Sequence, residues 1–290
     1  MNTRIIKKEN DCAIQITKRL TNKPLLIDPK TINTTLSLLN GPIGLAHLSF
    51  PDKINISQWG RFNGLIRHGN VGVIAIKDIL YNHSDFIFEN LLTGTSYDTI
   101  RSRFQAALND PSISAIVFDC DSPGGEVSGC FDLVDEIYNA RGTKPIYAVV
   151  NEMAYSGAYA IASAADKIFV PRTAGVGSVG VIYLHMDQSK YDENIGVKYT
   201  PIYAGSHKVD FDRHLPLSAE AQRAAREEIN RIYELFITTV SRNRAVSSQS
   251  VRNTEAALYF GKNAVDAGLA DSVMSWSKAL SDISLEYRTG

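Results

Sequence analysis

One serine of this 290-residue chain stands where its hydroxyl could act as a nucleophile. Ser156 follows the apolar run Ile146–Val150 and opens a stretch of small residues, from about Ser156 to Ala165, that favours a helix. Backbone amides at such a position can stabilise the negative charge that develops on oxygen during acyl transfer. The same position suits a serine that only caps the helix. The pattern alone therefore allows a catalytic or a structural serine.

A glycine-rich segment forms a second candidate site. Asp121–Glu126 has the sequence DSPGGE and follows the apolar run Ala115–Phe118. In open α/β sheets, ligands bind at the carboxyl ends of the strands, and paired glycines let the backbone approach a ligand closely. The segment is not a phosphate-binding P-loop, because it lacks the Lys-Ser/Thr ending. We interpret it as a tight turn between strand and helix, whose amides either point at a ligand or only close the turn.

Alternating strands and helices must position these segments. Short apolar, largely β-branched runs predict strands at Val71–Ile76, Ala115–Phe118, Ile146–Val150 and Ile168–Val170. Helical spacing and helix boundary signals predict helices at Thr31–Leu39, Ser96–Asn109, Val127–Ala140, Ser156–Ala165, Ser218–Arg244 and Gly261–Leu269. This alternation predicts an α/β fold with a mainly parallel sheet, built from β-α-β units and covered on both faces.

Composition excludes several classes of protein. Lys and Arg number 30 and Asp and Glu 31, so a net charge of −1 argues against a nucleic-acid partner and against an acidic membrane surface. Cys12, Cys120 and Cys130 form no Cys-x-x-Cys pair, which favours a reducing compartment and offers no zinc site. The first residues do not resemble a secretory signal, and no apolar run approaches the ~20 residues that span a bilayer. We expect a soluble, cytoplasmic protein with no membrane anchor, metal or cofactor.

Four stretches, in this order, resemble the signal peptide peptidase A family of serine proteases, and especially its phage branch, the capsid assembly (prohead) proteases. They are DCDSPGGEV at 119–127, MAYSGAYAIASAADKIFV at 153–170, GSVGVIYLHMD at 177–187 and YAGSHKVDF at 203–211. Four ordered stretches are far more specific than any one motif. The resemblance covers about residues 71–275 and implies a fold like that of the Clp protease proteolytic subunit and crotonase.

The resemblance also implies roles for particular residues. Ser156 matches the family's nucleophile, and Lys208, which follows it by 52 residues, matches its general base. Gly125 matches the residue whose amide binds the oxyanion, and the amide of Gly157 would be the second donor. Ser178, in the GSVG turn, is a candidate for orienting Lys208. A lysine can take the serine proton only as a neutral amine, which requires desolvation, so the loop around Lys208 must become buried on assembly.

Rival interpretations remain open from the sequence. Within the enzymes, a Ser-His-Asp triad like that of the Clp subunit could use His185 and Asp187, although His185 equally suits the protein core. A crotonase-like acyl-CoA enzyme would use the same amides without a nucleophile. A structural capsid component would keep the fold without turnover.

We expect a serine endopeptidase, namely a phage or prophage capsid maturation protease that degrades scaffold protein; a bacterial cytosolic peptidase is the alternative. Its partners would be a scaffold or capsid protein as substrate and copies of itself in a homo-oligomeric ring, in the host cytoplasm or the procapsid. The predicted organisation is an N-terminal arm at 1–65, a serine protease domain of the signal peptide peptidase A type at 66–275 and a C-terminal tail at 276–290. Activity should rise with pH through neutrality as the lysine base loses its proton.

Overall fold

The computed structural model describes residues 17, 19–40, 65–83 and 94–288, and one mixed sheet runs through this part of the chain. Its strands are β1 (Pro24–Ile27), β2 (Ile66–His68), β3 (Val71–Tyr81), β4 (Gly94–Ser96), β5 (Ala115–Glu126), β6 (Ile146–Tyr155), β7 (Lys167–Val170), β8 (Gly175–Gly177), β9 (Ile182–Tyr183), β10 (Leu258–Phe260) and β11 (Ser272–Val273). The helices are α2 (Pro29–Asn40), α5 (Tyr97–Asn109), α6 (Cys130–Asn139), α7 (Gly157–Ser163), α8 (Ser189–Asn194), α9 (Ala219–Arg244), α10 (Ser248–Arg252), α11 (Lys262–Asp266) and α12 (Trp276–Glu286), with a 3-10 turn η2 (Ser206–Val209).

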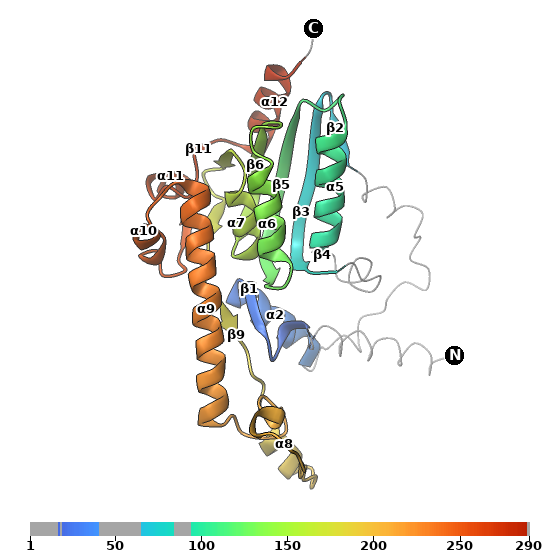
Figure 1. The fold of residues 1–290 in the computed structure, drawn as a ribbon, viewed down its shortest axis with the longest axis vertical. Coiled ribbons are helices and arrows are strands. Elements are labelled where there is room, and N and C mark those ends of the chain that lie inside the picture. The colour runs from blue at the N-terminus through green and yellow to red at the C-terminus, as the bar shows by residue number, and fades with distance from the viewer. Residues whose placement is uncertain (1–16, 18, 41–64, 84–93, 289–290) are drawn as a thin grey trace, which may run out of the picture.

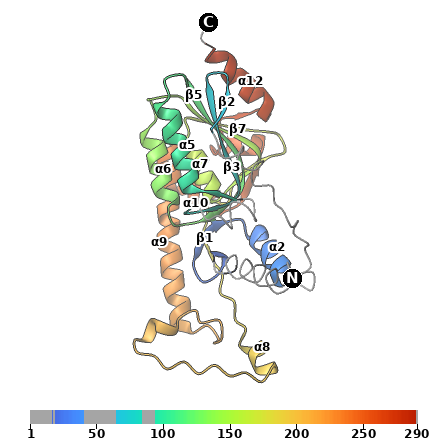
Figure 2. The same cartoon turned by 90° about the vertical axis from the view of Figure 1, so that its right-hand side faces the viewer.

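Strands β3, β5, β6 and β7 form the parallel centre of the sheet. Alternate side chains along a strand face opposite ways, so Ile74 and Ile116 lie in the main core with α5, α6 and α7, whereas Val73 and Val117 pack with α12. Figure 1 shows α5, α6 and α7 in front of the sheet, and Figure 2 shows α12 on its other side. Burial of both faces explains the continuous apolar runs. The predicted α/β fold with a mainly parallel sheet is confirmed.

The predicted elements exist, with shifted ends. The four predicted strands lie within β3, β5, β6 and β7, and the predicted helices correspond to α2, α5, α6, α7, α9 and α11. Helix α6 begins at Cys130 rather than Val127, because Gly129 precedes it with a φ of 82°. Helix α11 ends at Asp266, and Gly268 follows with a φ of 74°, as expected of a helix-capping glycine.

The prediction of a turn over DSPGGE is wrong, because β5 continues as a strand to Glu126. Its last residues pair on one side with β3, where Leu80 faces Gly125, and on the other side with β1, where Leu26 faces Gly125. A Cβ atom built on Gly125 would lie 1.8 Å from the carbonyl oxygen of Leu80. The glycine therefore permits a close approach of two strands here, rather than a reversal of the chain.

A segment that we call the projection, residues 184–217, extends away from the sheet and carries α8 and η2 (Figures 1 and 2). Helix α9 leads back from it. Ser218 caps this helix by accepting a hydrogen bond from the amide of Ala221 at 3.0 Å. Phe236 and Val240, in the second half of α9, belong to the main core, whereas its first half is mostly exposed. The helix thus joins a buried body to an exposed projection.

Residues near both ends of the chain pack against the sheet. Strand β1, from the predicted N-terminal arm, lies between β5 and β9. Helix α12, from the predicted C-terminal tail, buries Ala279, Leu280 and Ile283 against the face opposite α6. The boundaries at 65 and 275 stay a prediction, and residues 1–16, 18 and 41–64 of the predicted arm lie outside the described residues.

Candidate active site

Ser156 stands between β6 and α7 in a strained backbone conformation, with φ 52° and ψ −116°. Such a conformation costs about 1–3 kcal/mol and persists only when neighbours enforce it. Here the Ser156 amide donates to the carbonyl of Gly177 at 2.8 Å, and the Ser156 carbonyl accepts from the amide of Ala160 at 2.9 Å. The Oγ atom is buried, has no hydrogen-bond partner among the described residues and does not cap α7. The capping role is thereby excluded, and the hydroxyl stays available for chemistry.

Two glycine segments bring backbone amides next to Ser156. A Cβ atom built on Gly157 would lie 3.5 Å from the amide nitrogen of Gly125, and one built on Gly124 would lie 2.9 Å from the amide nitrogen of Gly157. Gly157 is the first residue of α7, so its amide has no partner within the helix. The predicted pair of donors, Gly125 and Gly157, is therefore brought together beside the serine. Two amides so placed can stabilise an oxyanion.

Hydrogen bonds hold the glycine-rich end of β5 in place. The Ser122 hydroxyl donates to the carbonyl of Asp78 at 2.6 Å and accepts from the amide of Gly124 at 3.1 Å. The Tyr97 hydroxyl donates to the carbonyl of Glu126 at 2.6 Å. Two of these bonds are buried and the bond to Asp78 is partly buried, so the backbone that presents the amide of Gly125 is held in position before any ligand arrives.

Strand β1 lies across this site. A Cβ atom built on Gly157 would lie 3.3 Å from the carbonyl oxygen of Leu26, and one built on Gly124 would lie 2.1 Å from the same oxygen. The carbonyl oxygen of Leu26 therefore lies close to the backbone of Gly124 and Gly157. Ser156 is only 1% exposed.

Glu126 binds the segment that precedes β1. Its carboxylate lies 2.5 Å from Nζ of Lys23 and 3.2 Å from a guanidinium nitrogen of Arg19, and it accepts a hydrogen bond from the amide of Asn82 at 2.9 Å. Burial alone would raise the pKa of Glu126, but the hydrogen bonds from Lys23 and Asn82 and the charges of Lys23 and Arg19 outweigh it and lower the pKa. The carboxylate is thus held ionised at the end of β5.

Ser178 is also close to Ser156. Strand β8 pairs with β6 so that Gly177 faces Tyr155, and Ser178 is the next residue. Ser178 is buried, has a φ of 55° and donates its amide to the carbonyl of Ala257 at 3.1 Å. The structure therefore assembles Ser156, Gly125, Gly157 and Ser178 in one place.

Lys208 is not part of this assembly. It lies in η2 on the projection, with an exposed side chain. Nδ1 of the neighbouring His207 lies 2.8 Å from a carboxylate oxygen of Asp210. Within the described residues, no hydrogen bond joins Lys208 to Ser156, and both views show the projection leading away from α7 (Figures 1 and 2). The predicted base therefore stays a prediction.

The alternative triad is not assembled either. Nδ1 of His185 lies 3.2 Å from Oδ1 of Asn22, and its Nε2 is buried with no partner among the described residues. Oδ1 of Asp187 accepts hydrogen bonds from the hydroxyl and the amide of Ser189, and these bonds lower the pKa of Asp187. The charge of His185 lowers the same pKa to a smaller extent, but among the described residues no hydrogen bond joins the carboxylate of Asp187 to the imidazole.

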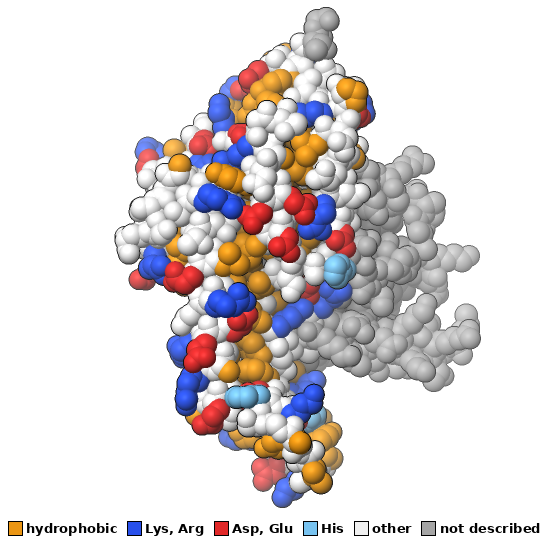
Figure 3. All heavy atoms as spheres, in the orientation of Figure 1, with side chains coloured by type: hydrophobic (Ala, Val, Ile, Leu, Met, Phe, Trp, Pro, Cys, Tyr) orange, Lys and Arg blue, Asp and Glu red, His pale blue; other side chains and the backbone are white. Residues whose placement is uncertain are grey.

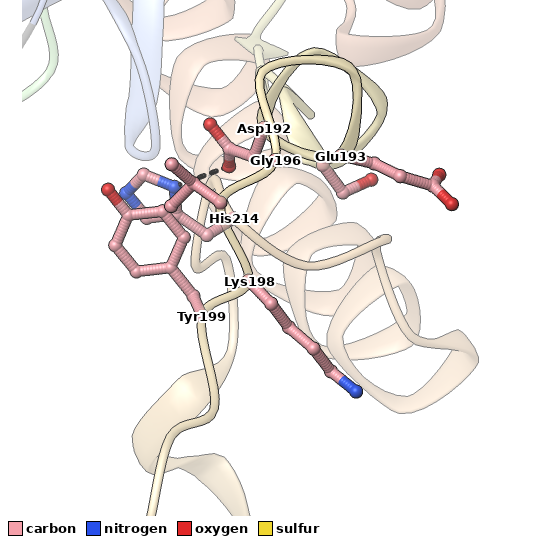
Figure 4. A pocket seen from close by; sticks show the side chains of 8 residues that line it. Asp192, Glu193, Gly196, Lys198, Tyr199 and His214 are labelled. Atoms are coloured by element: carbon pink, nitrogen blue, oxygen red, sulfur yellow. Dashed lines mark hydrogen bonds and ion pairs between the residues drawn. The ribbon is translucent and has the colours of Figure 1, made fainter.

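A pocket of about 410 Å³ lies on the projection, and Ser156 is not among its lining residues (Figure 4). The Nδ1 atom of His214 lies 2.8 Å from a carboxylate oxygen of the buried Asp192, and the ring of Tyr199 stacks on His214 with ring centroids 3.6 Å apart. These contacts tie α8 to the chain that leads into α9. We assign them a structural role in shaping the projection.

The described residues lack two further kinds of feature, a cluster of metal ligands and a membrane-spanning helix. No cluster of three or more His, Cys, Asp or Glu side chains with the placement of metal ligands occurs there. None of the described helices combines the length and apolarity that crossing a bilayer requires.

The sequence analysis did not predict strand β1, nor the contacts of Glu126 with Lys23 and Arg19 before it. The run PLLI at 24–27 is a short apolar segment bounded by Pro and Asp, which is a strand signal. No pattern in the sequence indicates that it lies on the glycine-rich strand of β5, because that pairing is separated by about 100 residues of chain.

Comparison with known proteins agrees with the resemblance. A family model described as "Peptidase family S49" matches residues 139–287. The chain is 39% identical over 186 residues to "Capsid assembly protease C" of Escherichia phage lambda, a match that covers 64% of this chain and 42% of the relative. It is 36% identical over 277 residues to "Head-tail preconnector protein GP5" of Enterobacteria phage P21, which covers 90% of this chain and 55% of the relative.

A more distant match reaches bacteria. The chain is 26% identical over 222 residues to "Putative signal peptide peptidase SppA" of Enterococcus faecium, covering 75% of this chain and 62% of that protein. The matches to the two phage relatives cover 42% and 55% of their lengths, so the chain spans about half of each.

Proposed function

The chain belongs to peptidase family S49, whose fold is of the Clp protease type, and we propose that it is a serine endopeptidase with Ser156 as nucleophile and Lys208 as general base. The observation that carries the proposal is the strained, buried Ser156, whose Oγ has no partner and stands beside the amides of Gly125 and Gly157. A side chain held this way has no evident structural use. Its surroundings suit acyl transfer.

The proposed reaction proceeds in two steps. Oγ of Ser156 attacks a peptide carbonyl while Nζ of Lys208 takes its proton, and the amides of Gly125 and Gly157 stabilise the oxyanion. The tetrahedral intermediate collapses as the lysine gives the proton to the departing amine, which leaves an ester on Ser156. Water, deprotonated by the same lysine, then attacks this ester, and the lysine returns the proton to Oγ of Ser156 as the acid product leaves.

We propose further that Lys208 reaches Ser156 from a neighbouring copy of the chain in a homo-oligomeric ring. In support, Lys208 is exposed on the projection, which extends away from α7, the helix that follows Ser156 (Figure 2). The projection also exposes large apolar side chains, of which Ile202 is 98% exposed; the set is Tyr191, Ile195, Val197, Tyr199, Ile202, Tyr203 and Leu217. Figure 3 shows hydrophobic side chains gathered at this tip of the molecule. Patches of this kind mark contact surfaces, and contact would also desolvate the lysine.

The biological role that we propose is maturation of a phage or prophage capsid. Two phage relatives, named as a capsid assembly protease and a head-tail preconnector protein, support this role. The substrate would then be a scaffold or capsid protein, cut in the host cytoplasm or inside the procapsid.

The test compares wild type, Ser156→Ala and Lys208→Ala with an unstructured protein substrate, followed by intact mass. We expect cleavage by wild type and a loss of at least about 10³-fold in each variant, with unchanged melting temperatures. Lys208→Arg is the matched control for charge: it keeps the cation but cannot act as a base, so it should also be inactive.

Three outcomes would contradict parts of the proposal. Cleavage by Ser156→Ala would exclude the nucleophile. Cleavage by Lys208→Ala would move the base elsewhere, with His185 as the first residue to replace. If neither wild type nor the Leu26→Asp variant cuts the substrate, a structural capsid component or an acyl-CoA enzyme would be favoured.

A further inference from the structure

We propose that β1 occupies the substrate groove of its own chain: residues Pro24–Ile27 lie between β5 and β9 as a bound peptide would, with the carbonyl of Leu26 at the oxyanion site. The inference rests on the proposed peptidase function, because it assigns the amides of Gly125 and Gly157 to the oxyanion. It adds two properties. The groove takes an extended peptide with an aliphatic residue at the position of Leu26, and Ser156 is inaccessible to other substrates until β1 leaves.

The backbone pairing of β1 is that of an added strand. It runs antiparallel to β5, with Leu25 facing Glu126 and Ile27 facing Gly124, and antiparallel to β9, with Leu25 facing Ile182. An extended peptide that pairs through its backbone with exposed strand edges is a common mode of peptide recognition, since the main chain supplies affinity and the side-chain pockets supply specificity.

The register places one carbonyl at the site. The amide of Asp28 donates to the carbonyl of Pro123 at 2.9 Å. In an antiparallel ladder, hydrogen-bonded pairs alternate with non-bonded pairs, so the next hydrogen-bonded pair is Leu26 with Gly125. At that position the amide of Gly125 faces the oxygen of Leu26, the same oxygen that lies 3.3 Å from a Cβ built on Gly157. The amide of Gly125 therefore faces a peptide carbonyl of this chain, and Gly157 lies close to the same oxygen.

The side chains of β1 divide between two environments. Leu26 is fully buried in the main core, in the same cluster as Ala154 and Ala158 on either side of Ser156. Leu25 and Ile27 point the other way, into a cluster with Ile32 of α2. This alternation is that of an extended strand. The Leu26 side chain is thus buried in apolar surroundings where the backbone passes Gly125 and Gly157, which assigns the groove a preference for aliphatic residues there.

An ionic contact holds the segment at the groove. Lys23, directly before β1, binds Glu126, directly after the glycine pair, and Arg19 binds the same carboxylate. Glu126 is nearly buried, with 8% of its side chain exposed, whereas Lys23 is 36% exposed. Reversing the charge of Lys23 therefore offers a way to loosen β1 that leaves the core unchanged.

The test measures access to position 156 without relying on catalysis. Ser156→Cys is made together with Cys12→Ser in the full chain, and alkylation of the new thiol by N-ethylmaleimide is followed by intact mass. Cys120 and Cys130 do not compete, because both are buried and burial raises the pKa of both thiols. We expect slow alkylation while β1 is in place.

Two changes should open the groove. Leu26→Asp, which would bury a carboxylate, should raise the alkylation rate by on the order of tenfold or more. Lys23→Glu should raise it about threefold through repulsion from Glu126, and it keeps the test decisive if Leu26→Asp fails to fold. Thr34→Asp, which adds the same charge at an exposed position of α2, should leave the rate unchanged. Fast alkylation with β1 intact, or slow alkylation in both opened variants, would overturn the proposal.

A peptide identifies the occupant. The nonapeptide NKPLLIDPK, residues 22–30, should slow alkylation of the Leu26→Asp protein, whereas the same peptide with Asp in place of its second leucine should not. Equal effects of the two peptides would contradict the assigned pocket.

Cleavage of an added protein separates this inference from the proposed function. If Leu26→Asp and Lys23→Glu, made with Ser156 intact, cut faster than wild type, both hold. If the variants are alkylated faster and the peptide slows their alkylation, but no variant cuts the added protein, the proposed peptidase function is wrong. The inference that β1 occupies the groove would still hold.

Discussion

The end of the sheet at Ser156 and the projection at 184–217 differ in how the chain holds them. At the sheet end, Ser156 is 1% exposed and the glycines beside it approach other backbone atoms closely. On the projection, Lys208 is exposed, and a Cβ atom built on Gly196 or Gly205 would meet nothing within 4 Å among the described residues. Of the proposed dyad, Ser156 is thus fixed by packing, whereas Lys208 is not.

This difference has a functional meaning. Amides that stabilise a transition state must be positioned before the substrate arrives, and a packed sheet does this at no further cost. A base that comes from an exposed segment is in place only after that segment has found a partner. The chain alone would then be inactive, and assembly would switch it on.

The largest effect on cleavage should come from adding one methyl group at the end of the sheet. Gly125→Ala places a Cβ atom 1.8 Å from the oxygen of Leu80, so the strand must shift and the amide with it. We expect a 10²- to 10³-fold loss of cleavage, as for removal of an oxyanion donor, and a destabilisation of about 1–3 kcal/mol or more. The rate of peptide cleavage measures the first effect, and thermal melting measures the loss of stability.

Gly196→Ala is the matched control on the projection. Its φ is 75°, so alanine there should cost about 1–2 kcal/mol, without a steric clash and with little change in cleavage. Equal losses of cleavage in the two variants would contradict the contrast between a packed site and an open projection.

Mixing two inactive variants should restore activity. If Lys208 acts on the Ser156 of a neighbouring copy, equal amounts of Ser156→Ala and Lys208→Ala, unfolded and refolded together, should regain about one quarter of wild-type activity, since half of the copies supply each residue. Each variant refolded alone is the control. A mixture that stays inactive, while refolded wild type recovers, would mean that both residues act within one copy.

Acid should loosen β1. The pKa of Glu126 is lowered in the folded chain from the ordinary 4.5, so its contacts with Lys23 and Arg19 contribute fully above that value and are lost as the pH falls through the lowered pKa. Hydrogen-exchange protection of residues 24–27, corrected for intrinsic rates, should therefore drop severalfold between about pH 5 and about pH 3.

Glu126→Gln is the control for this titration. It should show weaker protection at about pH 5 and no further fall in that range, since the titrating group is gone. A wild-type protection that is the same at both pH values would show that the ionic contact does not hold β1.

The smallest effect should come from helix caps. Ser218→Ala removes the cap of α9 next to the projection, and Ser247→Ala removes the same kind of cap from α10 in the body. Each should cost about 1 kcal/mol by thermal melting, with cleavage lowered less than about twofold. A much larger loss of cleavage for Ser218→Ala would show that the start of α9 positions the projection for catalysis.

Much of the body could be predicted from the sequence. The four stretches that carry the resemblance identified the family, and β-branched runs indicated β3, β5, β6 and β7, because strands buried on both faces must be apolar throughout. The prediction failed at DSPGGE, where glycine and proline normally signal a turn. Here the glycines allow strands to approach each other, which depends on the distant Leu26 and Leu80.

The sequence by itself determined the fold class and that Ser156 follows a strand and precedes a helix, because these depend on local apolar patterns and on motifs a few residues long. The tertiary structure alone decided that Ser156 lacks a capping bond, that Gly125 and Gly157 lie side by side, that β1 covers them and that Lys208 lies elsewhere. Each of these joins segments that are tens of residues apart. Such pairings are selected by the packing of the whole sheet, which no short pattern specifies.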